Sequence, residues 1–173
     1  MIISGDSKAG KSWMLLGLAA DLSEGLPWLG VNDPKTGGPL FPCVKSRVLY
    51  INLEIQDKSF INRIGRVYDK MGIEHPSGNL FFVNLRGHAQ PLDKLAPVII
   101  NMAKQVGAGA IIIDPIYKII TGDENNASDM GAFCNQFDRI CNETGCSAIY
   151  CHHHSKGAQG MKKAMDRASG SGV

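Results

Sequence analysis

The residues with the clearest chemical potential lie at the start of the chain. From residue 5 to residue 12 the sequence reads Gly-Asp-Ser-Lys-Ala-Gly-Lys-Ser, which satisfies the spacing Gly-x-x-x-x-Gly-Lys-Ser/Thr. In a loop of this kind, successive backbone N–H groups surround a phosphate. A chance match in a glycine-rich loop is the alternative. However, an apolar segment precedes the loop and an amphipathic helix pattern follows it, which is the context that the motif requires. The motif therefore predicts a P-loop that binds a nucleoside triphosphate.

Each position of this loop has an expected task. Gly5 ends the first strand where the backbone turns, and Gly10 lets the loop approach a phosphate with no Cβ in the way. Lys11 is expected to contact the β- and γ-phosphates, and Ser12 to ligate Mg²⁺. The predicted nucleotide-binding residues are Gly5, Asp6, Ser7, Lys8, Ala9, Gly10, Lys11, Ser12 and Trp13.

Two acidic residues follow apolar segments and are candidates for catalysis and metal binding. Asp114 closes a run of four hydrophobic residues, and at the carboxyl edge of a parallel sheet it would support Mg²⁺ beside the P-loop. The alternative is a turn aspartate before Pro115. Glu54 lies two residues after Asn52, where a carboxylate can activate the attacking water. A surface glutamate at a helix start is an equally good interpretation of its position alone.

Histidines end the last strand pattern, at positions 152 to 154. Alternation along a strand directs one or two of these imidazoles toward the nucleotide, so His152 or His153 is a candidate sensor of the γ-phosphate. Solvated histidines and a zinc site are the alternatives. The nearby cysteines are separated by six, four and four residues, unlike a C-x₂-C site, and two are expected on the buried face of a helix. These cysteines are Cys134, Cys141, Cys146 and Cys151.

Residues 155–173 form the one locally basic stretch, which we expect to be a mobile loop. Such a loop can bind a nucleic-acid backbone and couple that binding to hydrolysis. It lacks aromatic residues for base stacking, so a solvated tail is the alternative, and composition alone favours the tail. The candidate DNA-binding residues are Lys156, Lys162, Lys163 and Arg167.

Strand and helix patterns alternate along the chain and are expected to bring these residues to one sheet edge. Strand patterns cover residues 1–4, 46–52, 80–85, 110–114 and 147–152, and helix patterns cover 11–23, 57–71, 92–106 and 128–143. In the third helix, Pro97 is tolerable only near the first turn. This alternation predicts an α/β fold, a three-layer αβα sandwich with a mainly parallel central sheet.

Composition sets the remaining expectations. The 173 residues suggest one domain, residues 1–173, and the net charge of +2 is too small to predict nucleic-acid binding. The short apolar runs and the absence of a basic leader predict no membrane span and a cytoplasmic location. Five cysteines, an odd number, are expected as free thiols. The serine- and glycine-rich end suggests a domain that is incomplete at its C-terminus.

Together these residues resemble the RecA-like ATPases, and among them the hexameric replicative helicases of the plasmid RepA type. The strand Leu-Tyr-Ile-Asn-Leu-Glu ending at Glu54 and the segment His-His-x-x-Lys beginning at His152 select this branch. The other segments that carry the resemblance are the P-loop, residues 111–114, residues 123–130 and residues 167–172.

The resemblance implies that Glu54 is the catalytic glutamate and that the last strand lies between those of the P-loop and Asp114. It also implies ATP and Mg²⁺ as cofactors, hydrolysis at the subunit interfaces of a homo-oligomeric ring, and single-stranded DNA as the partner of loops after Asp114 and the histidines. A basic residue from a neighbouring subunit would complete each site. The expected function is that of a DNA helicase or DNA-dependent motor.

Two other functions remain open at this stage. One is a nucleotide-dependent regulatory or loader module, which would use the same ATP and Mg²⁺ residues. The other is a small-molecule kinase, which would need an arginine-rich lid over the acceptor. Arg63, Arg66 and Arg86 are dispersed in the sequence, which disfavours the kinase.

Overall fold

The computed structural model describes residues 1–120 and 126–153 of the chain. The described strands are β1 (Ile2–Gly5), β2 (Val48–Asn52), β3 (Leu80–Asn84), β4 (Ala110–Asp114) and β5 (Ser147–His153). The described α-helices are α1 (Lys11–Glu24), α2 (Asp57–Met71), α3 (Leu92–Val106) and α4 (Ala127–Thr144). The bounds of α2, α3 and β4 are the predicted ones, and each of the other elements differs from prediction by one or two residues at one or both ends.

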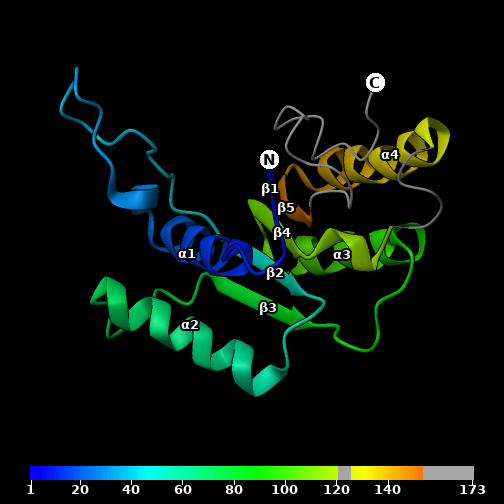
Figure 1. Ribbon diagram of the computed structural model, residues 1–173, viewed down its shortest axis with the longest axis horizontal. Helices are drawn as coiled ribbons and strands as arrows, with labels where there is room; N and C mark the ends of the chain where they lie inside the picture. The colour runs from blue at the N-terminus through cyan, green and yellow to red at the C-terminus, as the bar shows by residue number, and fades with distance from the viewer. Residues whose placement is uncertain (121–125, 154–173) are drawn as a thin grey trace.

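The strands form one parallel sheet in the order β1-β5-β4-β2-β3 (Figure 1). This confirms the α/β fold. It also confirms that the last strand lies between the P-loop strand and the strand that ends at Asp114. Because the strands are parallel, their carboxyl ends meet at one edge of the sheet. In register there, Asn52 of β2 lies between Asn84 of β3 and Asp114 of β4.

Helices cover both faces of the sheet, which makes the predicted three layers (Figure 1). On one face, Tyr50 and Ile112 pack with α1 and α2, and on the other, Ile111 and Ile113 pack with α3 and α4. All five residues of β4 are buried, as its continuous apolar run predicts. Each such isoleucine contributes about 1.5–3 kcal/mol to folding through the apolar surface it removes from water.

Two local expectations about the helices are wrong. The helical pattern of residues 57–71 places Ile61 on the same face as Phe60, yet Ile61 is 56% exposed, and Cys134, one of the two cysteines expected on the buried face of a helix, is exposed. Each lies one residue after a buried phenylalanine, so the apolar stripe is narrower than the sequence pattern suggests. Pro97 lies inside α3, shortly after its first turn, where the predicted bounds of this helix place it. Its side chain is exposed there, so water can solvate the carbonyl that loses its helical partner.

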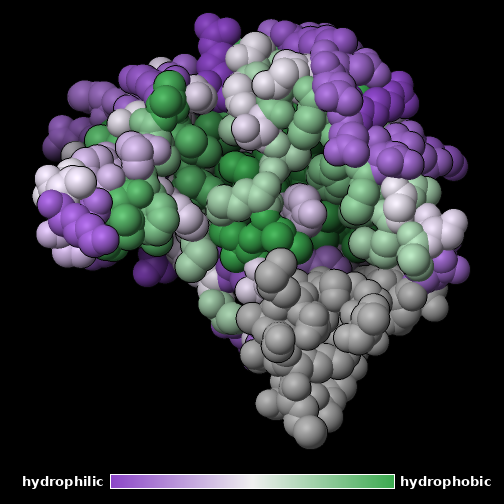
Figure 2. Space-filling model, turned by 90° about the horizontal axis from the view of Figure 1, so that it is seen from above, coloured by the Kyte–Doolittle hydropathy of each residue, from purple (hydrophilic) through white to green (hydrophobic). Residues whose placement is uncertain are grey.

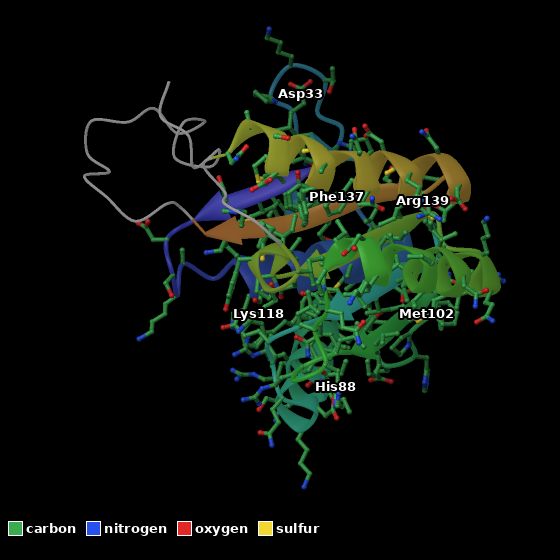
Figure 3. All side chains as sticks on the ribbon, turned by 90° about the vertical axis from the view of Figure 1, so that its right-hand side faces the viewer. Asp33, His88, Met102, Lys118, Phe137 and Arg139 are labelled. Carbon is green, nitrogen blue, oxygen red and sulfur yellow. The ribbon has the colours of Figure 1, made fainter. Side chains whose placement is uncertain are left out.

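The segment between α1 and β2, residues 28–45, forms an arm that projects from the body, with Asp33 near its tip (Figure 3). Trp28 and Cys43 pack the base of the arm against the core, and contacts within the arm hold the rest. The Asp33 carboxylate accepts hydrogen bonds from the Lys35 backbone N–H (2.8 Å) and the Thr36 hydroxyl (3.1 Å). The rings of Trp28 and Phe41 meet edge to face at 5.8 Å between centroids.

The surface carries both polar and apolar regions. On the face shown in Figure 2, hydrophobic residues gather at the centre, and hydrophilic residues lie along the upper rim. Within the part of the chain that the structure describes, no helix is both long enough and apolar enough to cross a bilayer.

Asp21 gives a test of how α1 is packed. Burial raises the pKa of its carboxyl to about 6. The folded state therefore binds the proton more tightly than the unfolded chain, and the stability gained from that proton is lost as the pH rises through about 6. We expect Asp21→Asn to raise the free energy of unfolding at about pH 7 and to change it little near pH 4. Urea denaturation across this pH range measures the difference.

The matched control is Asp69→Asn, which removes an exposed carboxyl from α2. It separates the burial of Asp21 from the loss of a negative charge in general. A stabilisation by Asp21→Asn that is the same at every pH would contradict the explanation.

Candidate functional site

A cleft of about 630 Å³ lies at the carboxyl edge of the sheet, between the P-loop and the ends of β2 and β4. Its lining includes every P-loop residue from Ser7 to Trp13 and both acidic candidates, Glu54 and Asp114. The residues that complete the lining are Ile55, Gln56, Ser59, Arg63, Arg86, Pro115 and Cys151. The structure thus brings together the residues that the sequence marks for phosphate binding, metal binding and water activation.

Lys11 is held at the base of the P-loop. Its ammonium group donates to the backbone carbonyl oxygens of Gly5 (2.8 Å) and Asp6 (2.7 Å), and the side chain is buried. These bonds draw the two ends of the loop together and keep the positive charge inside its ring of backbone groups. Gly5 and Asp6 contribute these carbonyls to Lys11 and do not themselves line the cleft.

The amino end of α1 faces the cleft through Gly10, which has φ 85° and ψ 10°. A Cβ added at Gly10 would meet no protein atom within 4 Å, so a larger side chain would not clash with the protein. Glycine is favoured here because the backbone is in the left-handed conformation. The first turn of α1 contains no acidic residue. No carboxylate in that turn therefore offsets the partial positive charge at the amino end of α1, and this charge favours the binding of an anion.

Asp114 is buried, and both of its carboxylate oxygens accept hydrogen bonds. Tyr50 Oη donates to Oδ2 (2.7 Å), and Cys151 Sγ donates to Oδ1 (2.8 Å). Burial first, and then the Asp114 carboxylate, raise the pKa of the Tyr50 phenol and that of the Cys151 thiol. Both groups therefore keep their protons at neutral pH and can donate them in hydrogen bonds to Asp114.

The residues of the cleft fit a magnesium ion bound together with a nucleotide. Asp114 and Ser12 offer the oxygen ligands that Mg²⁺ prefers, and both line the cleft. Mg²⁺ is typically bound through one or two carboxylates together with substrate phosphates and water. Among residues 1–120 and 126–153, no cluster of three or more His, Cys, Asp or Glu side chains suits a metal held by protein alone.

Asn52 builds the turn that carries Glu54, a role that the sequence analysis missed. The side chain is fully buried, and its Oδ1 accepts from the backbone N–H groups of Glu54 (3.3 Å) and Ile55 (2.9 Å). Its Nδ2 donates to the Ile55 carbonyl oxygen (2.6 Å), to which Asn84 also donates (3.1 Å). The side chain of an asparagine commonly forms a hydrogen bond with the backbone two residues later in the chain. The position of Asn52 at the end of a strand pattern was therefore a signal for this turn in the sequence.

Arginines from separate parts of the chain converge on the cleft, which corrects the interpretation that they are dispersed. Arg63 of α2 and Arg86, two residues after β3, both line it. Trp13 is 40% exposed, and its ring lies under the guanidinium groups of Arg63 (5.1 Å) and Arg66 (5.6 Å). Trp13 therefore belongs to the cleft wall and not to the core beneath α1.

Of the histidine candidates, His152 lies outside this lining. His152 is buried at the end of β5, in register with Ser4 of β1, and the neighbouring Cys151 lines the cleft instead. The backbone of His153 pairs with Gly5 of the P-loop strand. The predicted DNA-binding residues, Lys156, Lys162, Lys163 and Arg167, lie outside the described residues, as does most of the polar loop after β4.

Gly10 gives a test of the loop conformation. Alanine with φ 85° costs roughly 1–2 kcal/mol, so we expect Gly10→Ala to weaken ATP binding about tenfold by disfavouring this conformation. Titration with a fluorescent ATP analogue measures the loss. Gly17→Ala is the control, because Gly17 lies within α1 with open space around it and does not have a positive φ. Equal losses in both variants would contradict the role of Gly10.

Asn52 gives a second test. Asn52→Ala leaves buried backbone groups of the Glu54 turn unpaired, so we expect a loss of about 1–3 kcal/mol in the free energy of unfolding. Hydrolysis of ATP should fall while ATP affinity is retained, because the phosphate-binding loop is untouched. Asn79→Ala removes a comparable side-chain bond, to the Ser23 carbonyl oxygen (3.2 Å), outside the cleft lining. A loss of ATP affinity in Asn52→Ala that matches its loss of hydrolysis would contradict this assignment.

Comparison with known proteins agrees with this geometry. Residues 1–159 match the AAA domain family. The chain is also similar in structure to the flagellar accessory protein FlaH from Methanocaldococcus jannaschii, with a TM-score of 0.53 and 19% sequence identity. The similarity covers 88% of this chain and 59% of the FlaH chain, so this chain spans less than two thirds of that protein. The chain belongs to the AAA domain family and has the fold of a RecA-like P-loop ATPase.

Proposed function

We propose that this ATPase domain hydrolyses ATP with Mg²⁺ and drives a DNA helicase or another DNA-dependent motor. One observation carries the hydrolytic part. Lys11 and Ser12 of the P-loop share a single cleft with two carboxylates, Asp114 and Glu54. Phosphate binding, metal binding and water activation need these groups within reach of one nucleotide.

The chemistry and surroundings of each side chain in the cleft indicate its role in hydrolysis. The P-loop N–H groups and Lys11 bind the phosphates, and Ser12 and Asp114 hold Mg²⁺, which neutralises phosphate charge when bound. Glu54, exposed to the cleft, accepts a proton from the water that attacks the γ-phosphorus while the bond to the ADP oxygen breaks. Arg63 and Arg86 supply positive charge to the phosphate oxygens.

The DNA-dependent part of the proposal is supported by the sequence. The resemblance to RepA-type helicases, the basic residues Lys156, Lys162, Lys163 and Arg167, and the histidines before them all point to a loop that senses both DNA and the γ-phosphate. In this scheme His152 or His153 senses the γ-phosphate. Copies of the chain assemble into a ring in which a neighbour supplies a further basic residue.

A nucleotide-dependent accessory or loader module is the second candidate. The fold is shared with a protein whose name describes a flagellar accessory role, so the fold itself does not select a helicase. Such a module would bind ATP through the same residues. It would differ from a motor in the response of its turnover to DNA.

Glu54→Gln tests the hydrolytic role. The substitution keeps the shape of the side chain and removes the base, so we expect ATP affinity to be retained and kcat to fall by about 10²–10⁴-fold. Release of inorganic phosphate measures turnover, and titration of a fluorescent ATP analogue measures affinity. Glu74→Gln, which changes an exposed glutamate outside the cleft lining, is the control. Unchanged hydrolysis in Glu54→Gln would remove Glu54 from the mechanism.

The same assay, run with and without single-stranded DNA at several protein concentrations, separates the candidates. Phosphate release that rises with both DNA and protein concentration supports an assembling motor. A rate of phosphate release that does not change when single-stranded DNA is added favours the accessory module. Because Arg63 and Arg86 could also bind the phosphates of a kinase substrate, phosphate transfer to an acceptor other than water would overturn both.

A further inference from the structure

The carboxylate of Asp114 is bonded from both sides by residues of the two neighbouring strands. Tyr50 comes from β2 and Cys151 from β5, and β4 lies between these strands in the sheet. The two donors reach different oxygens of the same carboxylate, at 2.7 Å and 2.8 Å. Two bonds on opposite sides fix the rotation of the carboxylate plane as well as its position.

Packing holds the two donors in place. Tyr50 has no exposed surface, and its ring packs against Phe60 of α2 with 5.2 Å between centroids. Cys151 is 1% exposed and packs in the core cluster beneath α1. Neither side chain has room to swing away, so neither can release Asp114 without a rearrangement of the core.

We propose that Tyr50 and Cys151 are positioning residues for the metal ion, acting through Asp114. The inference rests on the proposed function, in which Asp114 supports Mg²⁺. Partners that bond a metal-binding carboxylate set its orientation, and their loss typically lowers metal affinity about 10–100-fold. The two donors hold the oxygens of Asp114 toward the P-loop face of the sheet, so that Mg²⁺ meets a carboxylate already in its binding orientation.

The test measures the free Mg²⁺ concentration that half-saturates binding of a fluorescent ATP analogue to the full chain. Tyr50→Phe and Cys151→Ala each remove one donor, and we expect each to raise that concentration at least about tenfold. Affinity for the analogue in EDTA should stay at the wild-type value, since the P-loop is unchanged. Cys151→Ser keeps a donor in place and should stay near the wild-type Mg²⁺ dependence.

Two matched controls remove the same chemical groups elsewhere. Tyr68→Phe deletes a hydroxyl that contacts Ser23 Oγ (3.0 Å), and Cys146→Ala deletes a buried thiol that donates to the Ala108 carbonyl oxygen (2.9 Å). Both should leave the Mg²⁺ dependence unchanged. A shift in these controls equal to that in the test variants would overturn the inference, because it would show a general effect of loosening the core.

A double-mutant cycle shows whether the effect passes through Asp114. In the Asp114→Asn background, Tyr50→Phe should cause no further change in Mg²⁺ dependence, because the carboxylate that it orients is gone. Circular dichroism establishes that each variant is folded, and the cysteine series alone decides the matter if Tyr50→Phe does not fold.

The outcomes distinguish this inference from the proposed function. An unchanged Mg²⁺ dependence in folded variants that have lost a donor overturns the positioning role and leaves the ATPase proposal standing. A wild-type chain that binds no nucleotide at any Mg²⁺ concentration overturns both. A raised Mg²⁺ requirement with unchanged affinity in EDTA supports both.

Discussion

A carboxylate buried inside a protein must find hydrogen-bond donors for its oxygens, and at Asp114 this requirement joins three strands. The donors come from β2 and β5, the strands on either side of β4. The same two strands lead to the other parts of the cleft, because β2 runs into the Glu54 turn and β5 pairs with the P-loop strand β1. The position of Asp114 is therefore tied to the positions of the glutamate and the phosphate loop.

The parallel register of the sheet places polar side chains from several strands at the same carboxyl edge as Asp114. Asn84, Asn52 and Asp114 end three adjacent strands in register, and each has a side chain suited to bind backbone, substrate or metal. Two of these polar side chains organise the turn that holds Glu54, and the third faces the P-loop. A sheet that shifted by one residue at β4 would turn Asp114 to the opposite face, away from α1.

Sequence patterns predicted most of the features that depend on neighbouring residues. The spacing of the P-loop and the apolar run of β4 are local, and the structure contains both. The resemblance to known ATPases added the place of the last strand, between the P-loop strand and the strand that ends at Asp114. Contacts between distant residues were not accessible in this way. Tyr50 and Cys151 lie 64 and 37 residues from Asp114, and no local pattern marks either one as its partner.

The arginines of the cleft are a second example of a contact between distant residues that the sequence did not predict. Arg63 and Arg86 are separated by a helix, a loop and a strand, and only the return of β3 to the side of β2 brings both to the cleft. The exposure of side chains on helices was equally difficult to predict. Ile61 and Cys134 each follow a buried phenylalanine and widen the apolar stripe in the sequence pattern, but neither is covered by the rest of the protein.

Near the tip of the arm formed by residues 28–45, Asp33 bonds to Lys35 and Thr36 of the same arm, and none of the arm's residues lines the cleft. Its tip, near Asp33, stands away from the sheet (Figure 3). Changes in the length or sequence of that tip therefore strain neither the core nor the phosphate loop. The tip is consequently a natural place to graft a peptide tag or a fluorescent reporter, so that the domain can be followed or immobilised while its cleft stays open.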